Sequence, residues 1–156
     1  MKTTIFAFIL LLHSLVFYGQ NRVYNIKDTT NEGLTMSDLD SIYKNGLSAN
    51  DSTNPVFSHE AFDSIVKPER QKLLRNLRAH FDDNGFNWQP ALMIWTRMYV
   101  DENGRIDYLL YHFITPINSI KEAEFRKTVN KFLMENKLNI SAPVKFSICG
   151  RVVFKE

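Results

Sequence analysis

The clearest alternation of apolar and polar positions runs from Leu92 to Val100. One set of alternate residues is almost wholly apolar and the other is mixed, a period of two that is typical of a half-buried strand. Asp101-Glu102-Asn103-Gly104 follows, and its glycine can adopt the positive φ that a tight hairpin turn requires. The aromatic-rich stretch from Ile106 to Phe113 is predicted to be the return strand. We therefore expect a β-hairpin over residues 92–113.

A helix and a third strand are predicted after the hairpin. Ser119-Ile120-Lys121-Glu122 has the pattern of a capping box, and four apolar residues recur behind it at helical spacing: Phe125, Val129, Phe132 and Leu133. Burying these four stabilises by roughly 6–12 kcal/mol. Ordering about 17 residues costs more than that, so the helix must pack on a sheet. In the last segment Val144, Phe146, Ile148, Val152 and Phe154 share one face, and Gly150 indicates a bulge.

The order strand, turn, strand, helix, strand predicts a small α+β fold. A hairpin followed by a helical crossover most simply places the third strand beside the first. We therefore expect a three-stranded antiparallel sheet in the order 2-1-3, a split βαβ unit, with the helix on one face. The last strand would then lie at an edge of the sheet, with one flank of its backbone unpaired.

The residues before the hairpin are predicted to contain N-terminal helices. Ser58 is a candidate N-cap, and Pro68 would end one helix and start a second that reaches Phe81. The second helix has an apolar stripe of Leu73, Leu74, Leu77 and Phe81, and Arg70, Lys72, Arg75 and Arg78 are expected to face water. Residues 58–156 thus form the folded domain. Residues 20–57 are polar and turn-rich and are interpreted as a linker, either a flexible tether or a carrier of one short helix from Ser37 to Gly46.

The first 19 residues are predicted to be a secretory signal peptide. Lys2 supplies a positive charge, a nearly continuous apolar run extends from Ile5 to Phe17, and Gly19 precedes a polar stretch. A retained membrane anchor is the alternative, but the apolar run is shorter than the ~20 residues that cross a bilayer. We therefore expect an exported protein, periplasmic or associated with the outer membrane, with no transmembrane segment in the mature chain.

Composition narrows the classes of function. The chain has 156 residues, room for one domain, and a formal net charge of +2, which gives no basis for nucleic-acid binding. Cys149 is the single cysteine, so no internal disulfide can form. An isolated cysteine in a β-rich segment is most often a small buried hydrophobe, and we expect Cys149 to be buried.

No catalytic constellation is apparent along the chain. The histidines after the signal segment are His59, His80 and His112, and they lie in no nucleophile motif and no HExxH or Cys/His metal pattern. We therefore predict a protein that is not an enzyme and needs no cofactor or metal. Trp95, Arg97 and Tyr99 on one strand face, with His112, could bind a small ligand. The favoured interpretation is an aromatic face covered by the N-terminal helices.

The segment from Thr96 to Phe154 resembles the C-terminal domain of TonB-family proteins, envelope modules of Gram-negative bacteria. Met98-Tyr99-Val100-Asp101-Glu102-Asn103-Gly104-Arg105-Ile106 fits the family's hairpin pattern position by position. Phe132-Leu133-Met134-Glu135-Asn136 stands where the family has a Trp-x-aromatic-x-Pro pattern, and the energy transducers' membrane anchor and proline-rich spacer are absent from this sequence. The resemblance implies partner binding by strand addition to the last strand, not an energy-transducing role.

Together these observations predict an exported, non-catalytic module that binds an envelope protein or an extended peptide by β-strand addition. The predicted contact residues are Val144, Phe146, Ile148, Gly150, Val152 and Phe154. Two alternatives remain open at this point: a structural envelope protein that forms a homodimer through its edge strands, and a small-ligand carrier that uses Trp95, Arg97, Tyr99 and His112.

Overall fold

The computed structural model describes residues 22–29, 33–47, 54–89 and 91–155. Along the chain the elements are β1 (Val23–Asn25), α2 (Met36–Ile42), β2 (Lys44–Asn45), α3 (His59–Ala61), the π-helical turn η2 (Phe62–Val66), α4 (Lys67–Asp83), β3 (Leu92–Val100), β4 (Ile106–Phe113), α5 (Ser119–Glu135) and β5 (Phe146–Phe154). The predicted signal peptide lies outside the described residues and stays a prediction. Among the helices that are described, none combines the length and the apolar character needed to cross a membrane.

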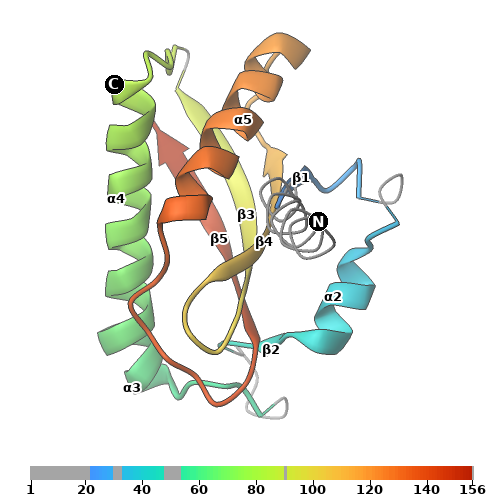
Figure 1. Cartoon of the computed structure of the whole chain (residues 1–156), viewed down its shortest axis with the longest axis vertical. Helices are drawn as coiled ribbons and strands as arrows, with labels where there is room; N and C mark the ends of the chain where they lie inside the picture. The colour runs from blue at the N-terminus through green and yellow to red at the C-terminus, as the bar shows by residue number, and fades with distance from the viewer. Residues whose placement is uncertain (1–21, 30–32, 48–53, 90, 156) are drawn as a thin grey trace, which may run out of the picture.

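The strands form one mixed five-stranded sheet in the order β1-β4-β3-β5-β2 (Figure 1). β3 pairs antiparallel with β4 and β5, whereas the two outermost strands run parallel to their neighbours. The prediction of a three-stranded antiparallel sheet is therefore wrong. The two additional strands, of three and two residues, come from the segment that was interpreted as a linker. Strands that short have no alternation from which they could be recognised.

The central strand pairs β3–β5 and β3–β4 set the register of the sheet. β5 pairs with β3 without interruption from Phe146↔Val100 to Phe154↔Leu92, so the bulge predicted at Gly150 is wrong. The glycine instead makes room for a helix side chain, because a methyl group at Gly150 would lie 2.9 Å from Nη2 of Arg70.

Apolar side chains are buried on both faces of the sheet. The larger core lies between the sheet and helices α4 and α5, which cover one face (Figure 1). A smaller cluster on the opposite face contains Leu39 and Tyr43, from α2 and the residue after it, packed on Tyr99 and Leu110. The segment 33–47 is therefore ordered against the sheet. Its helix is capped by Thr35, whose hydroxyl accepts a hydrogen bond from the Asp38 amide, two residues before the predicted start of the helix at Ser37.

The longer helices follow the predicted apolar stripes, but one cap differs. Ser58 caps the helical run as expected, accepting a hydrogen bond from the Ala61 amide at 3.2 Å. Helix α5 begins one residue earlier than the predicted capping box, because Asn118 Oδ1 accepts from the Lys121 amide at 2.8 Å. Glu122 is thus free for another role. Its Oε1 accepts hydrogen bonds from Asn25 Nδ2 at 2.7 Å and from the Tyr111 hydroxyl at 2.8 Å, which joins β1 and β4 to α5.

Candidate functional site

The two flanks of β5 differ in how far they are paired. The inner flank pairs with β3 along the whole strand. On the outer flank the Lys44 amide donates to the Lys145 carbonyl at 3.0 Å and the Gly46 amide to the Ser147 carbonyl at 2.9 Å. β2 ends at Asn45, so within the described chain no strand pairs with the outer flank beyond Ser147.

The residues with unpaired backbone groups follow from the alternation of a strand. Successive residues direct their N–H and C=O groups to opposite flanks. Because Lys145 and Ser147 face outward, Cys149, Arg151 and Val153 do so too, and none of the three has an outer-flank backbone partner among the described residues. Three outward-facing N–H and C=O pairs form a template for an added strand.

The residues predicted from the sequence as the partner contacts are the alternate set on the same strand. Phe146, Ile148, Gly150, Val152 and Phe154 face the main core and direct their backbone groups toward β3, and Val144 precedes the strand. Sequence reasoning identified the strand but assigned the contacts to its apolar positions. Local sequence carried no signal for the odd-numbered set, because apolar side chains mark the buried face of a strand and not the flank on which its backbone groups remain free.

A groove runs between α4 and the end of β5, on the unpaired side of the strand. It encloses about 280 Å³ and is lined by Gln71, Leu74, Arg75 and Arg78 of α4 together with Val152, Val153 and Phe154 of β5. Figure 1 shows α4 running beside β5 at this side of the sheet. Val153 is 52% exposed, which leaves a hydrophobic contact open beside the groove.

The helix side of the groove is basic. Arg75 is exposed and Arg78 has one weak ion pair, 3.9 Å from Asp82. Arg70, which was expected to face water, instead has its Nε and Nη2 atoms buried without a hydrogen-bond partner. Removal from water lowers the pKa of Arg70 from its ordinary value. Residue 70 lies three and seven positions before Leu73 and Leu77, so the helical period places it on their side of α4, and the missing side chain at Gly150 gives its guanidinium room against the sheet.

The aromatic face of β3 is divided between a covered part and an open part. Asp40 of α2 binds two of its residues, pairing with Arg97 Nη2 at 2.7 Å and accepting from the Tyr99 hydroxyl at 2.9 Å. Burial, followed by this hydrogen bond, raises the pKa of Tyr99. Helix α2 thus covers Arg97 and Tyr99, whereas the helices predicted after Ser58 pack in the main core on the other face of the sheet. Trp95 and His112 lie beyond it and line a hollow of about 400 Å³ with Ile26, Lys27 and Met36.

Cys149 is exposed and not buried as predicted. It follows Ile148, which is buried in the main core, so the alternation of β5 turns its thiol to the opposite face of the sheet. The residue opposite Cys149 on β3 is Arg97, a polar residue of the same face.

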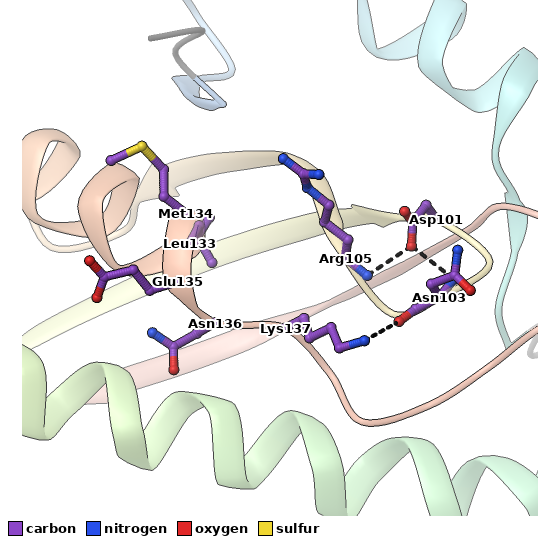
Figure 2. Close-up of a pocket in the computed structure, with 8 residues that line it drawn as sticks. All are labelled: Asp101, Asn103, Arg105, Leu133, Met134, Glu135, Asn136 and Lys137. Carbon is purple, nitrogen blue, oxygen red and sulfur yellow. Dashed lines mark hydrogen bonds between the residues drawn. The ribbon is translucent and has the colours of Figure 1, made fainter. Parts of the chain in front are cut away.

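A further hollow, of about 390 Å³, lies between the β3–β4 turn and the end of α5 (Figure 2). Two of its charged side chains, those of Asp101 and Lys137, are bonded to the turn itself. Asp101 Oδ1 accepts hydrogen bonds from the amides of Asn103 and Arg105 at 2.9 and 2.8 Å, and Lys137 Nζ donates to the Asn103 carbonyl at 3.4 Å. Figure 2 shows Asp101 directed at the backbone of its own turn. The hollow therefore lies where the β3–β4 turn is hydrogen-bonded to the segment after α5, and we assign it no binding role.

Within the described residues, no three His, Cys, Asp or Glu side chains gather closely enough to hold a metal ion. Comparison with protein-family models, with curated proteins and with solved structures found no match to this chain. The function must therefore be argued from the geometry of β5 and its groove.

Proposed function

We propose that this protein is an exported binding module of the cell envelope that takes up an extended segment of a partner protein as an additional strand of its sheet. The incoming strand would lie along the outer flank of β5, next to β2 and beside α4. The observation that carries this proposal is the unpaired row of backbone groups on Cys149, Arg151 and Val153. Main-chain hydrogen bonds supply affinity in this mode of recognition, and adjoining pockets supply specificity.

Two features of the sheet favour this use of β5. Proteins commonly end a β-sheet in very short strands, which limits unwanted pairing at its edges. The outermost strands β1 and β2 are of this kind. β2, however, covers only the beginning of β5 and leaves the second half of a nine-residue strand open. The groove beside that half offers both apolar and basic side chains to an extended ligand. The resemblance to TonB C-terminal domains suggests the same mode of binding and remains a prediction from the sequence.

The geometry is less favourable for the alternative of edge-to-edge dimerisation. In two of the possible registers, a two-fold axis through antiparallel copies of this flank would place Arg151 opposite Arg151 or opposite Lys155. Like charges directly opposite each other destabilise a strand pair. We therefore expect the protein to be monomeric at micromolar concentration. Light scattering measures this directly, and a stable dimer would support the structural role instead.

The proposal is tested by removing a single outward amide. Val153→Pro eliminates the N–H that faces outward and leaves the hydrogen bonds to β3 in place, as proline on an edge strand permits. Val153→Thr is the matched control, because it keeps both the amide and the β-branched shape. Each variant would be used as bait in envelope extract, after circular dichroism has established that it is folded. We expect the partner to be lost with proline and retained with threonine; equal recovery by the two would contradict strand addition at this flank.

A further inference from the structure

The groove beside β5 carries more positive charge than its surroundings neutralise. Arg70 and Arg75 on α4 and Arg151 on β5 make no ion pair within the described part of the chain. Arg78 is paired with Asp82 only at 3.9 Å, in an exposed position where such a contact contributes little. Three guanidinium groups of α4 therefore lie on the groove side of the unpaired half of β5 without a strong carboxylate partner, and Arg151 lies on the opposite face with Cys149 and Val153.

Arg70 is the most constrained of these groups. Its guanidinium lies against Gly150, where Nη2 and Cζ would be 2.9 and 3.3 Å from an added methyl carbon. Its Nε and Nη2 atoms are buried without a hydrogen-bond acceptor. A buried charged donor that lacks an acceptor destabilises the folded state, so this position gains most from a nearby anion.

An added strand would bring its own side chains to both sides of the sheet. Alternate residues of the strand would face α4, where Leu74, Arg75 and Arg78 line the groove. The remaining residues would face the opposite side, next to the exposed side chain of Val153. The first set therefore meets the guanidinium groups of α4, and the second set meets the apolar side chain of Val153 with Arg151 beside it.

We propose that the segment recognised by β5 is acidic: an extended stretch of a partner protein with Asp or Glu at the alternate positions that face α4 and apolar residues between them. This inference rests on the proposed function, because it specifies the occupant of the same flank. The carboxylates would pair with Arg75 and Arg78 at the mouth of the groove and with Arg70 toward Gly150. Charge-assisted hydrogen bonds from arginine to carboxylate are stronger than those between neutral groups.

The experiment compares two short, terminally blocked peptides that differ only in charge. One alternates Glu with Val and the other alternates Gln with Val. Each is titrated into the isotope-labelled protein while the backbone amides of Cys149, Arg151 and Val153 are followed by NMR and hydrogen exchange. We expect both peptides to protect these amides, and the Glu peptide to bind about three- to tenfold more tightly. This preference should shrink at about 0.5 M salt because exposed charges are then screened.

Substitutions on α4 identify the groups responsible. Arg75→Gln combined with Arg78→Gln should weaken binding of the Glu peptide and leave that of the Gln peptide unchanged. Lys127→Gln, on the exposed side of α5, removes a charge away from the groove and is the matched control. Arg70→Met should leave the protein as stable as before or more so, yet reduce the preference for the Glu peptide. A purely structural role of Arg70 would lower the stability of the variant and leave that preference intact.

The outcomes separate the two proposals. If both peptides protect the three amides with equal affinity, the acidic specificity is refuted and strand addition stands. If neither peptide protects them, strand addition and the acidic specificity are both refuted. A loss of affinity in Lys127→Gln as large as that in the Arg75 and Arg78 double variant would show attraction by overall charge alone, which would also overturn the inference.

Discussion

Gly104 in the β3–β4 turn offers the sharpest test of how the domain is held together. It adopts φ +82°, in the left-handed region that favours glycine. A methyl group there would collide with the Leu138 carbonyl oxygen and lie 2.8 Å from the Ile140 carbonyl oxygen. Gly85, after α4, has a similar φ of +72° but no neighbouring atom within 4 Å of such a methyl group. The two glycines therefore share the conformational requirement and differ in the space around them.

The expected cost of Gly104→Ala follows from this difference. Left-handed backbone costs a residue with a side chain about 1–2 kcal/mol, partly offset by the reduced entropy of the unfolded chain. Gly85→Ala should therefore lower the free energy of unfolding by roughly 0.5–1 kcal/mol. At Gly104 the turn must also move away from residues 138–142. That movement breaks the hydrogen bond from Leu138 N to the Gly104 carbonyl, 2.9 Å, and the bond from Ala142 N to the Glu102 carbonyl, 3.0 Å.

Two such hydrogen bonds contribute about 1 kcal/mol each, so Gly104→Ala should cost roughly 3 kcal/mol in total. For a domain of this size that loss lowers the melting temperature by about 10 °C. Urea unfolding of the wild type and both variants, followed by circular dichroism, measures the difference. Equal destabilisation by the two alanines would refute the steric argument and would leave only the backbone conformation as a cause.

Two further predictions concern the buried polar network. Burial, followed by hydrogen bonding to carboxylates, raises the pKa of Tyr99 and of Tyr111, so the folded state keeps these protons to higher pH than the unfolded chain does. The free energy of unfolding should therefore be steady below about pH 10 and fall as the pH rises above it, with a smaller slope in Tyr111→Phe; an unchanged slope in urea titrations would contradict this. Glu122→Ala should lower the free energy of unfolding by about 2–3 kcal/mol, because it leaves Asn25 and the Tyr111 hydroxyl without their acceptor. Glu124→Ala, on the exposed side of the same helix, is the control and should change the free energy of unfolding little in the same assay.

The elements with long periodic patterns could be predicted from the sequence. Leu92–Val100 and Ile106–Phe113 carry the alternation and turn chemistry of a hairpin, and they pair as predicted. The stripe of α5, including Phe125 and Val129, is buried as expected. These predictions succeed because each element presents one apolar face to a shared core, and that requirement repeats over several residues of local sequence.

The misassigned elements and residues depend on contacts between distant parts of the chain. β2 exists because Lys44 and Asn45 meet β5, and two residues carry no pattern of their own. Arg70 is buried because Gly150, far along the chain, leaves space for its guanidinium. Cys149 is exposed because the face it occupies is only partly covered by α2. None of these outcomes can be found from the composition of the segment in which it occurs.

The candidate site shows the same difference between what local sequence predicts and what contacts between distant segments decide. The sequence by itself determined that the chain ends in an amphipathic strand, because burial imposes a period of two on its side chains. The tertiary structure decided how much of that strand stays unpaired and which residues direct their backbone groups outward: β2 stops after Asn45, and the outward set is Cys149, Arg151 and Val153. The physical reason is that side-chain burial is recorded in local sequence, whereas backbone hydrogen bonding depends on which strand lies alongside.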